Sequence, residues 1–257
     1  MPQDANFNEG VIYAERAFLS KKNHLNIDKE VIIKNIDLDG KDILDFGCGM
    51  GGMSTWYAQN WNCNVLGIDI DQFHIDVAQH IKRKYDVQNV SFECQDILTY
   101  PNERKFDLIV MNDVAEHIEI NTLELIMASL KERLKRGGKI LITYPPWHGP
   151  YASHLHHDIK ILWSQFIPKP ILHRLIVKNN RQLVGKEDLM TMYYSLNHLT
   201  HDKLMRIMRK IRMKKIFRKS HSIISRLWNI NARIFPFYFL ITKELVIFTR
   251  DSVDTSK

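Results

Sequence analysis

The chain has 257 residues, of which 45% are apolar and 25% charged, a composition that fits a globular protein with a large core and excludes a disordered one. Its three cysteines form no paired spacing, which excludes a disulfide framework and is typical of a reducing compartment. No leader-like segment opens the chain, and the longest apolar run near its end, 234–241, is far shorter than the about 20 residues that cross a bilayer. We therefore expect a cytoplasmic protein without a transmembrane segment.

Positive charge is concentrated in one segment. The formal net charge is +7, yet residues 203–219 hold nine lysines or arginines and no acidic residue, so the rest of the chain carries about −2. Basicity is therefore a local property and not one of the whole surface.

The first predicted elements are helical, because residues 9–36 carry apolar side chains at helix-like spacing, interrupted by a polar stretch at 20–26. Beyond Asp39-Gly40, short apolar segments alternate with helical ones. We predict strands at 42–46, 64–69, 90–93, 106–111 and 138–144, with helices at 52–60, 71–84 and 119–136. This alternation is typical of a parallel sheet covered by helices on both faces.

The alternation stops after Tyr144. Residues 145–200 contain five prolines and many aromatic residues, which predicts an insertion that faces the substrate and not a second domain. A helix at 200–212 follows, and strands at 214–219 and 244–250 would complete the sheet. We expect a single domain (1–257) with four parts: an N-terminal helical region (1–40), a ligand-binding core (41–144), the insertion (145–200), and a terminal helix with strands (201–257).

A glycine-rich loop follows the first predicted strand. In ILDFGCGMGG (43–52) the glycines fit both the G-x-G-x-x-G of dinucleotide-binding enzymes and the G-x-G-x-G of methyltransferases. Asp45, two residues before the first glycine, separates the two templates. A dinucleotide site normally has a buried apolar residue there, since a carboxylate would repel a pyrophosphate. The carboxylate suits a ligand with cationic groups, such as the ammonium and sulfonium of S-adenosylmethionine (SAM).

Four motifs, in order, resemble those of class I SAM-dependent methyltransferases: DFGCGMG (45–51), GID (67–69), QDI (95–97) and NDVAEH (112–117). Each motif alone would fit a turn, a strand end or a helix cap, but their order and spacing agree with the family over residues 41–144. The resemblance implies a Rossmann-like α/β fold with a mostly parallel, seven-stranded sheet and helices on both faces. It also implies SAM as the cofactor.

The resemblance assigns the first motif to the methionine end of SAM. The residues that would hold this end, through the first carboxylate and the loop backbone, are Asp45, Gly47, Cys48, Gly49 and Gly51.

The later motifs would bind the rest of the cofactor. Asp69 would bind the ribose hydroxyls, with Ile70 against the adenine. Asp96 would accept from the adenine amino group, with Ile97 beside the ring, and Asn112 would lie beneath the sulfonium. All of them lie at or just after the carboxyl ends of predicted strands, where open α/β sheets bind ligands.

Histidines dominate the segment expected to face the acceptor. An oxygen nucleophile must lose its proton, and a histidine suits that task. A Pro-Pro-aromatic stretch followed by a histidine resembles a subgroup of bacterial small-molecule methyltransferases, which favours His154 as general base. His117, next to Glu116, is the second candidate. For either histidine, a surface or supporting role is the alternative.

Two other chemistries compete for this segment. Tyr144-Pro-Pro-Trp147 is similar to the Asn/Asp-Pro-Pro-aromatic signature of enzymes that methylate amino groups, but it follows the fifth predicted strand and not the fourth. A metal would use His154 and His156 on one face of a strand, with donors from His157-Asp158. We expect no metal, because zinc needs three or four ligands in fixed geometry and metal-dependent methyltransferases of the catechol type use mainly carboxylates.

The basic segment 203–219 has two interpretations. Its helical basic residues lie opposite an apolar stripe, as on a solvated face. Alternatively, it would fit an anionic or membrane-associated substrate, aided by Phe235, Phe237 and Tyr238, or RNA. Aromatic residues are not interleaved with the charges, so a nucleic-acid partner is the weaker expectation.

We therefore expect a SAM-dependent methyltransferase that acts on an oxygen atom of a small-molecule or lipid-linked acceptor. The alternatives are an RNA methyltransferase that uses residues 203–219 and a SAM-binding protein without turnover.

Overall fold

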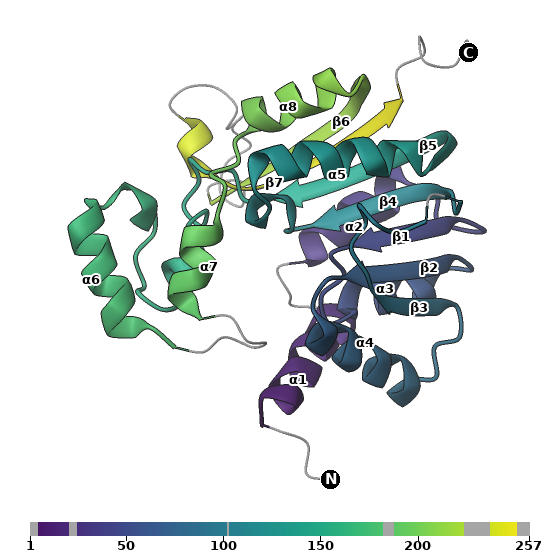
Figure 1. Cartoon of the computed structure of the whole chain (residues 1–257), viewed down its shortest axis with the longest axis horizontal. Helices are drawn as coiled ribbons and strands as arrows, with labels where there is room; N and C mark the ends of the chain where they lie inside the picture. Colours follow the sequence, from purple (N-terminus) through teal and green to yellow (C-terminus); the bar gives the residue numbers. More distant parts are fainter. Residues whose placement is uncertain (1–4, 21–24, 102, 182–187, 224–236, 251–257) are drawn as a thin grey trace.

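One seven-stranded sheet forms the centre of the protein, in the order β3-β2-β1-β4-β5-β7-β6 (Figure 1). The computed structural model describes residues 5–20, 25–101, 103–181, 188–223 and 237–250. The strands are β1 (Asp42–Phe46), β2 (Asn64–Asp69), β3 (Val90–Cys94), β4 (Phe106–Asn112), β5 (Leu134–Tyr144), β6 (Met213–Ser222) and β7 (Ile241–Arg250). β1 to β5 are parallel, and β7 pairs antiparallel with both β5 and β6. The mostly parallel, seven-stranded sheet predicted from the sequence is confirmed.

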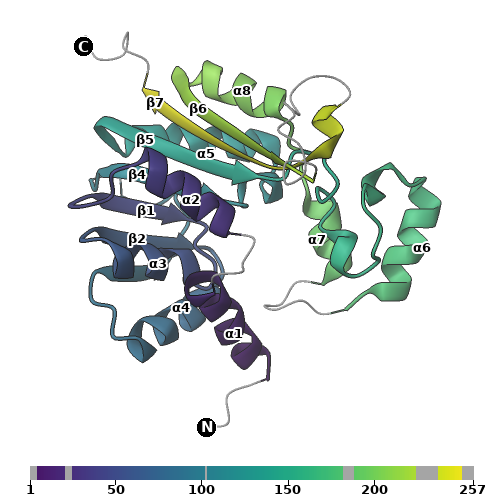
Figure 2. The same ribbon diagram turned by 180° about the vertical axis from the view of Figure 1, so that it is seen from behind.

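Helices cover both faces of the sheet, also as predicted (Figure 2). One face carries α1 (Ala5–Leu19), α2 (Asn26–Asn35), α3 (Gly52–Asn60) and α4 (Gln72–Lys84), and the other carries α5 (Ile120–Glu132) and α8 (His201–Lys210). Side chains alternate along each strand. Ile43 of β1 therefore packs in the first layer and its neighbour Leu44 in the second.

Polar side chains fix where several helices begin. The side chains of Asp71, Glu119 and Thr200 accept hydrogen bonds from backbone amides at the starts of α4, α5 and α8. The helix predicted to reach residue 136 ends at Glu132, because β5 already starts at Leu134. The register between β4 and β5 shifts within this early part of β5.

The insertion lies beyond the carboxyl ends of β4 and β5 (Figures 1 and 2). It contains the short 3-10 helices η2 (Leu155–His157) and η3 (Ser164–Phe166), followed by α6 (Lys169–Asn179) and α7 (Leu189–Ser195). A small apolar cluster of its own holds it together: Leu155, Leu172, Ile176, Leu189 and Met192. The segment therefore has its own small core but is positioned by the sheet.

Several charged side chains of the basic segment 203–219 form contacts within the protein. Lys210 pairs with Glu124 of α5, and the Lys203 ammonium donates to two backbone carbonyls. On β6, the strand at one edge of the sheet, three lysines are exposed: Lys214, Lys215 and Lys219. Lysines on an edge strand hinder its pairing with a strand of another chain. Phe235, which we associated with a membrane contact, lies outside the described residues. None of the described helices has the length and apolar character that a membrane crossing requires.

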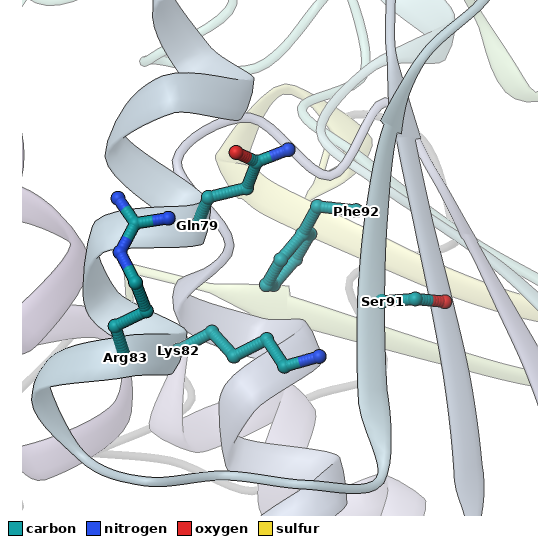
Figure 3. Close-up of a pocket in the computed structure, with 5 residues that line it drawn as sticks. All are labelled: Gln79, Lys82, Arg83, Ser91 and Phe92. Carbon is teal, nitrogen blue, oxygen red and sulfur yellow. The ribbon is translucent and has the colours of Figure 1, made fainter.

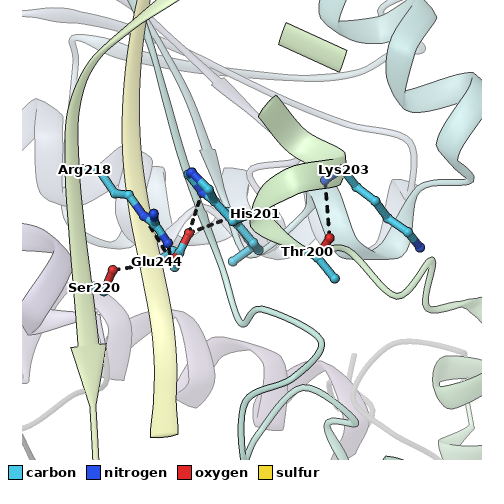
Figure 4. Close-up of polar contacts among 7 residues, drawn as sticks. Thr200, His201, Lys203, Arg218, Ser220 and Glu244 are labelled. Carbon is cyan, nitrogen blue, oxygen red and sulfur yellow. Dashed lines mark hydrogen bonds and ion pairs between the residues drawn. The ribbon is translucent and has the colours of Figure 1, made fainter. Parts of the chain in front are cut away.

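A buried charge network joins β7 to β6 and α8 (Figure 4). Glu244 is 1% exposed and accepts hydrogen bonds from the Arg218 guanidinium, the Tyr144 hydroxyl (2.8 Å) and the Ser220 hydroxyl (3.3 Å). The His201 Nδ1 atom lies 3.0 Å from Glu244 Oε2. Burial alone would raise the pKa of Glu244, but His201 and Arg218 outweigh it and lower the pKa to about 2.

Stability should therefore fall in acid through Glu244. Its pKa drops from an ordinary value of 4.5 to about 2 in the folded chain, so it contributes on the order of 3 kcal/mol above about pH 5. This contribution is lost as the pH falls towards 2. Urea unfolding of the wild type and of Glu244→Gln should differ clearly at about pH 6 and much less at about pH 3. An equal difference at both pH values would contradict the expectation.

Candidate active site

The predicted ligand-binding motifs converge at one edge of the sheet. Because β1 to β4 are parallel, their carboxyl ends lie together and bring the glycine loop, Asp69, Asp96 and Asn112 to that edge. The strand order reverses between β1 and β4, which is where open α/β sheets bind ligands.

The glycine loop turns the chain sharply from β1 into α3. Gly47, Gly49 and Gly51 all have positive φ angles, of 67°, 51° and 78°. A Cβ atom on Gly51 would lie 2.7 Å from both Ala78 and Phe92, whereas one on Gly49 would meet nothing within 4 Å. Packing therefore requires glycine at position 51, while at position 49 only the backbone conformation does.

Asp69 ties the glycine loop to the end of β2. Its carboxylate accepts hydrogen bonds from the backbone amides of Gly49 (2.9 Å) and Asp71 (3.0 Å), and His74 Nδ1 lies 3.4 Å away. Burial would raise the pKa of Asp69, but these hydrogen bonds outweigh it and hold the pKa below its ordinary value. Asp69 is thus an ionised carboxylate at neutral pH.

Asp45 is the other carboxylate beside the loop. It points from β1 towards α3 and accepts a 2.6 Å hydrogen bond from the Ser54 hydroxyl. Burial, together with the charge of Asp69, raises the pKa of Asp45 to about 7 against the effect of that hydrogen bond. A cationic group close to this pair would favour the charged form of Asp45.

The residues expected around the adenine differ in their exposure to solvent. Ile70 is 78% exposed at the edge, and Asp96 is exposed while its carboxylate accepts from the Leu98 amide (2.9 Å). Ile97 is 1% exposed and packs in the core that α5 covers. The structure therefore brings Ile70 and Asp96, but not the Ile97 side chain, to the open edge.

A buried lysine holds the chain just after Asn112. Lys243 of β7 donates to Asp113 (2.6 Å) and to Asp28 of α2 (2.5 Å). Burial lowers the pKa of Lys243, but the two carboxylates outweigh it and raise the pKa above its ordinary value. Asp113 has a φ angle of 53°, so the chain leaves β4 through a left-handed residue. The carboxamide of Asn112 is buried and makes no hydrogen bond to the described residues.

Beyond this turn, a carboxylate meets two imidazoles. Glu116 and His117 belong to the 3-10 helix η1 (Ala115–His117), and His154 directly precedes η2. The His117 and His154 rings meet edge to face, with centroids 4.9 Å apart, and Glu116 Oε1 lies 3.7 Å from His154 Nε2. The structure thus brings both predicted catalytic histidines together.

Burial controls the charge of this cluster. It lowers the pKa of His154 to about 3, helped by His117, and it also lowers the pKa of His117 against the charge of Asp113. Burial and the charge of Asp113 raise the pKa of Glu116 well above its ordinary value. Both imidazoles are therefore neutral at neutral pH.

The metal interpretation assumed a strand that carries His154 and His156, and this prediction was wrong, because the described chain has no strand there. His154 has a φ angle of 57°, and residues 155–157 form η2. Backbone amides in this segment bond locally instead, from His154 to the Tyr151 carbonyl and from Asp158 to the Leu155 carbonyl, as in a 3-10 turn.

Two surface hollows lie elsewhere. One is lined by Gln79, Lys82 and Arg83 of α4 with Ser91 and Phe92 of β3 (Figure 3). The other lies at the end of β3 and is lined by Glu93, Gln95, Tyr100, Pro101, Glu103 and Arg104. Neither contains a residue of the histidine cluster or of the glycine loop.

The sequence model of a family described as "Methyltransferase domain" matches residues 37–210. The chain belongs to this methyltransferase family. The match confirms the resemblance to class I SAM-dependent methyltransferases, the enzyme class and SAM as the cofactor.

Solved structures agree with the methyltransferase fold. A SAM-dependent methyltransferase from Clostridium acetobutylicum aligns with a TM-score of 0.61 at 14% identity, over 95% of this chain and 98% of its own. A geranyl diphosphate C-methyltransferase from Streptomyces coelicolor aligns with a TM-score of 0.58 at 11% identity, over 97% of this chain and 100% of its own. At these identities, the likeness shows the fold alone.

Curated relatives match only part of this methyltransferase. A ubiquinone biosynthesis O-methyltransferase from Coxiella burnetii is 30% identical over 113 residues, which are 44% of this chain and 47% of that protein. A phosphoethanolamine N-methyltransferase from Triticum aestivum is 37% identical over 106 residues, 40% of this chain and 20% of that protein. The matched part spans about half or less of the length of these relatives.

Some residues of the methyltransferase site had no sequence signal. Asp28 lies in a segment predicted as an ordinary helix, and Lys243 lies just before the strand predicted at 244–250, so only the fold brings them to Asp113. Glu116 was noted solely as the neighbour of His117, although its carboxylate completes the cluster.

The contrast between two glycines of the loop can be tested. Gly51→Ala should lower the free energy of unfolding by about 2–4 kcal/mol, because a left-handed alanine costs about 1 kcal/mol and the crowded Cβ adds about 1–3 kcal/mol. Gly49→Ala, the matched control, should cost about 1 kcal/mol. Urea unfolding without cofactor measures both, and equal losses would show that packing at Gly51 is unimportant.

Proposed function

We propose that this methyltransferase transfers the methyl group of SAM to an oxygen atom of a small-molecule acceptor. One observation carries the proposal: the cluster of Glu116, His117 and His154 lies in the turns that follow β4 and β5, next to the position expected for the sulfonium beside Asn112. Neutral imidazoles and a carboxylate can orient and polarise a hydroxyl group there. The Coxiella relative, named as an O-methyltransferase, supports oxygen as the methylated atom. The wheat relative, named as an N-methyltransferase, supports the alternative that nitrogen is methylated.

The proposed cofactor site follows the edge of the sheet. The ammonium of SAM would lie near Asp45 and the backbone of the loop from Gly47 through Cys48 and Gly49 to Gly51, where two carboxylates favour a cation. This arrangement is supported by the positive φ angles of the loop, which turn its backbone towards the edge.

The ribose and adenine would continue along the same edge. Asp69 is ionised and suited to accept from both ribose hydroxyls, and the exposed Ile70 offers an apolar surface to the adenine. Asp96 would accept from the adenine amino group, while Ile97 would contribute only as the packing beneath that turn.

The role of His154 as general base stays a hypothesis and meets a physical difficulty. A base works best when its pKa lies near the operating pH, whereas burial holds the pKa of His154 at about 3. The histidines therefore fit better as neutral groups that accept a hydrogen bond from the acceptor or hold another group, with rate arising chiefly from alignment of oxygen, methyl and sulfur.

No observation favours the RNA alternative. Lys203, Lys210 and Arg218 direct their charges to partners within the protein, and the remaining basic residues of 203–219 are divided between α8, its C-terminal turn and an edge strand.

The cofactor site can be tested at Asp69. Asp69→Ala should weaken SAM binding at least about 100-fold, because two charge-assisted hydrogen bonds at about 1.5 kcal/mol each are lost. Isothermal titration calorimetry measures the affinity, with Asp76→Ala, an exposed carboxylate of the same helix-strand unit, as matched control. Unchanged affinity in a folded Asp69→Ala protein would overturn the ribose assignment.

The acceptor side can be tested at His154. His154→Ala should reduce methyl transfer to a hydroxylated acceptor about 100-fold or more while SAM affinity stays unchanged. His173→Ala, an exposed histidine of α6, serves as control and should keep full activity. Mass spectrometry of the products of hydroxylated and amine acceptors identifies the methylated atom, and transfer to nitrogen alone would contradict the proposal.

A further inference from the structure

Three potential ligand groups meet at the acceptor side of the site. The ligand atoms of Glu116, His117 and His154 all lie within 4.8 Å of one another, although 37 residues separate the two histidines. Asp113, the carboxylate in the turn before η1, instead accepts hydrogen bonds from Lys243 (2.6 Å) and from the Thr143 hydroxyl (3.2 Å). The cluster therefore combines one carboxylate with two imidazoles.

Glu116 supplies a second, independent observation. Its side chain is only 3% exposed, and neither carboxylate oxygen makes a hydrogen bond to any described residue. The same is true of His154 Nε2, which lies 3.7 Å from Glu116 Oε1, too far for a hydrogen bond. A buried carboxylate without a hydrogen-bond partner is costly, and a cation bound beside it would favour its charged form.

We propose that Glu116, His117 and His154 bind a divalent transition-metal ion, such as Zn²⁺ or Mn²⁺, that activates the acceptor oxygen. This inference rests on the proposed function. Two histidines and one carboxylate form a ligand set that catalytic metal sites use while keeping coordination positions open for substrate. This ion replaces His154 as the group that assists deprotonation.

The distances suit such an ion. Ligand atoms about 2.1 Å from a tetrahedral metal lie about 3.4 Å apart, close to the 3.7 Å between Glu116 and His154. The other separations reach up to 4.8 Å, so small side-chain rotations would bring His117 into the same sphere. Because the Glu116 side chain is buried, its position is already fixed before an ion binds.

The reaction balances without a further reactant. The ion polarises the acceptor O–H bond, and the proton leaves to water. An oxygen electron pair then forms the new O–CH₃ bond as the S–CH₃ bond of SAM breaks. The electron pair of that bond stays on sulfur, giving S-adenosylhomocysteine and the methyl ether with no oxidation or reduction.

Metal binding can be measured without any acceptor. Full-length protein purified without a histidine tag is stripped with a chelator and titrated with Zn²⁺ and with Mn²⁺. We expect about one ion per chain, by calorimetry and elemental analysis. Glu116→Gln, which keeps the side-chain volume, and His154→Ala should weaken binding at least about 100-fold, while His173→Ala should bind as the wild type. SAM affinity verifies that each variant is folded.

The outcomes separate this inference from the proposed function. Stoichiometric binding that Glu116→Gln abolishes supports the site, whereas no retained ion, or equal binding in the cluster variants, overturns it. Loss of methyl transfer in chelator and its recovery on metal addition support activation, and full transfer in chelator overturns it while the O-methyltransferase proposal stands. Metal binding without transfer to any hydroxylated acceptor contradicts the proposed function and leaves the metal site supported.

Discussion

A single buried ammonium connects the parts of this protein that make its site. Lys243, near the start of β7, lies between Asp28 of α2 and Asp113 after β4, so it joins segments 215 and 130 residues away. The two ion pairs help to compensate a left-handed turn at Asp113, which costs roughly 1–2 kcal/mol. That turn directs the chain from Asn112 into η1, and hence determines where Glu116 and His117 lie. The acceptor side of the methyltransferase is thus built on an interaction within the protein interior.

The cofactor side could be predicted from the sequence because its determinants are local. Asp45 lies near the end of β1, just before the glycine loop. Asp69 ends β2 and Asp96 follows β3 by two residues, so strand prediction alone places these side chains on a common edge. Parallel pairing then leaves little freedom in where these side chains lie. Ile97 is the exception, since which of two adjacent side chains enters the core depends on how α5 packs above that turn.

The acceptor side depends on contacts that no local pattern encodes. His154 reaches His117 through a proline-rich path without regular hydrogen-bond pairing, and its left-handed conformation could not be read from residue type. The pKa of His154 likewise follows from the layers around it, which is why a histidine predicted as a base near neutral pH lies in a site that keeps it neutral. The basic segment shows the opposite case. A local pattern suggested a binding surface, but several of its charged side chains form ion pairs within the protein.

The position of β7 has a consequence for how the chain folds during synthesis. β7 is the last strand in sequence yet lies between β5 and β6, so β6 has no partner in the sheet until residues 241–250 have left the ribosome. Lys243 belongs to the same strand, and its bridge to Asp28 and Asp113 therefore also forms last. A nascent chain can assemble the cofactor edge early, but the turn at Asp113 gains its bridge to α2 only when β7 has been added. The side of the site that is proposed to bind the acceptor is therefore complete only after the whole sheet has formed.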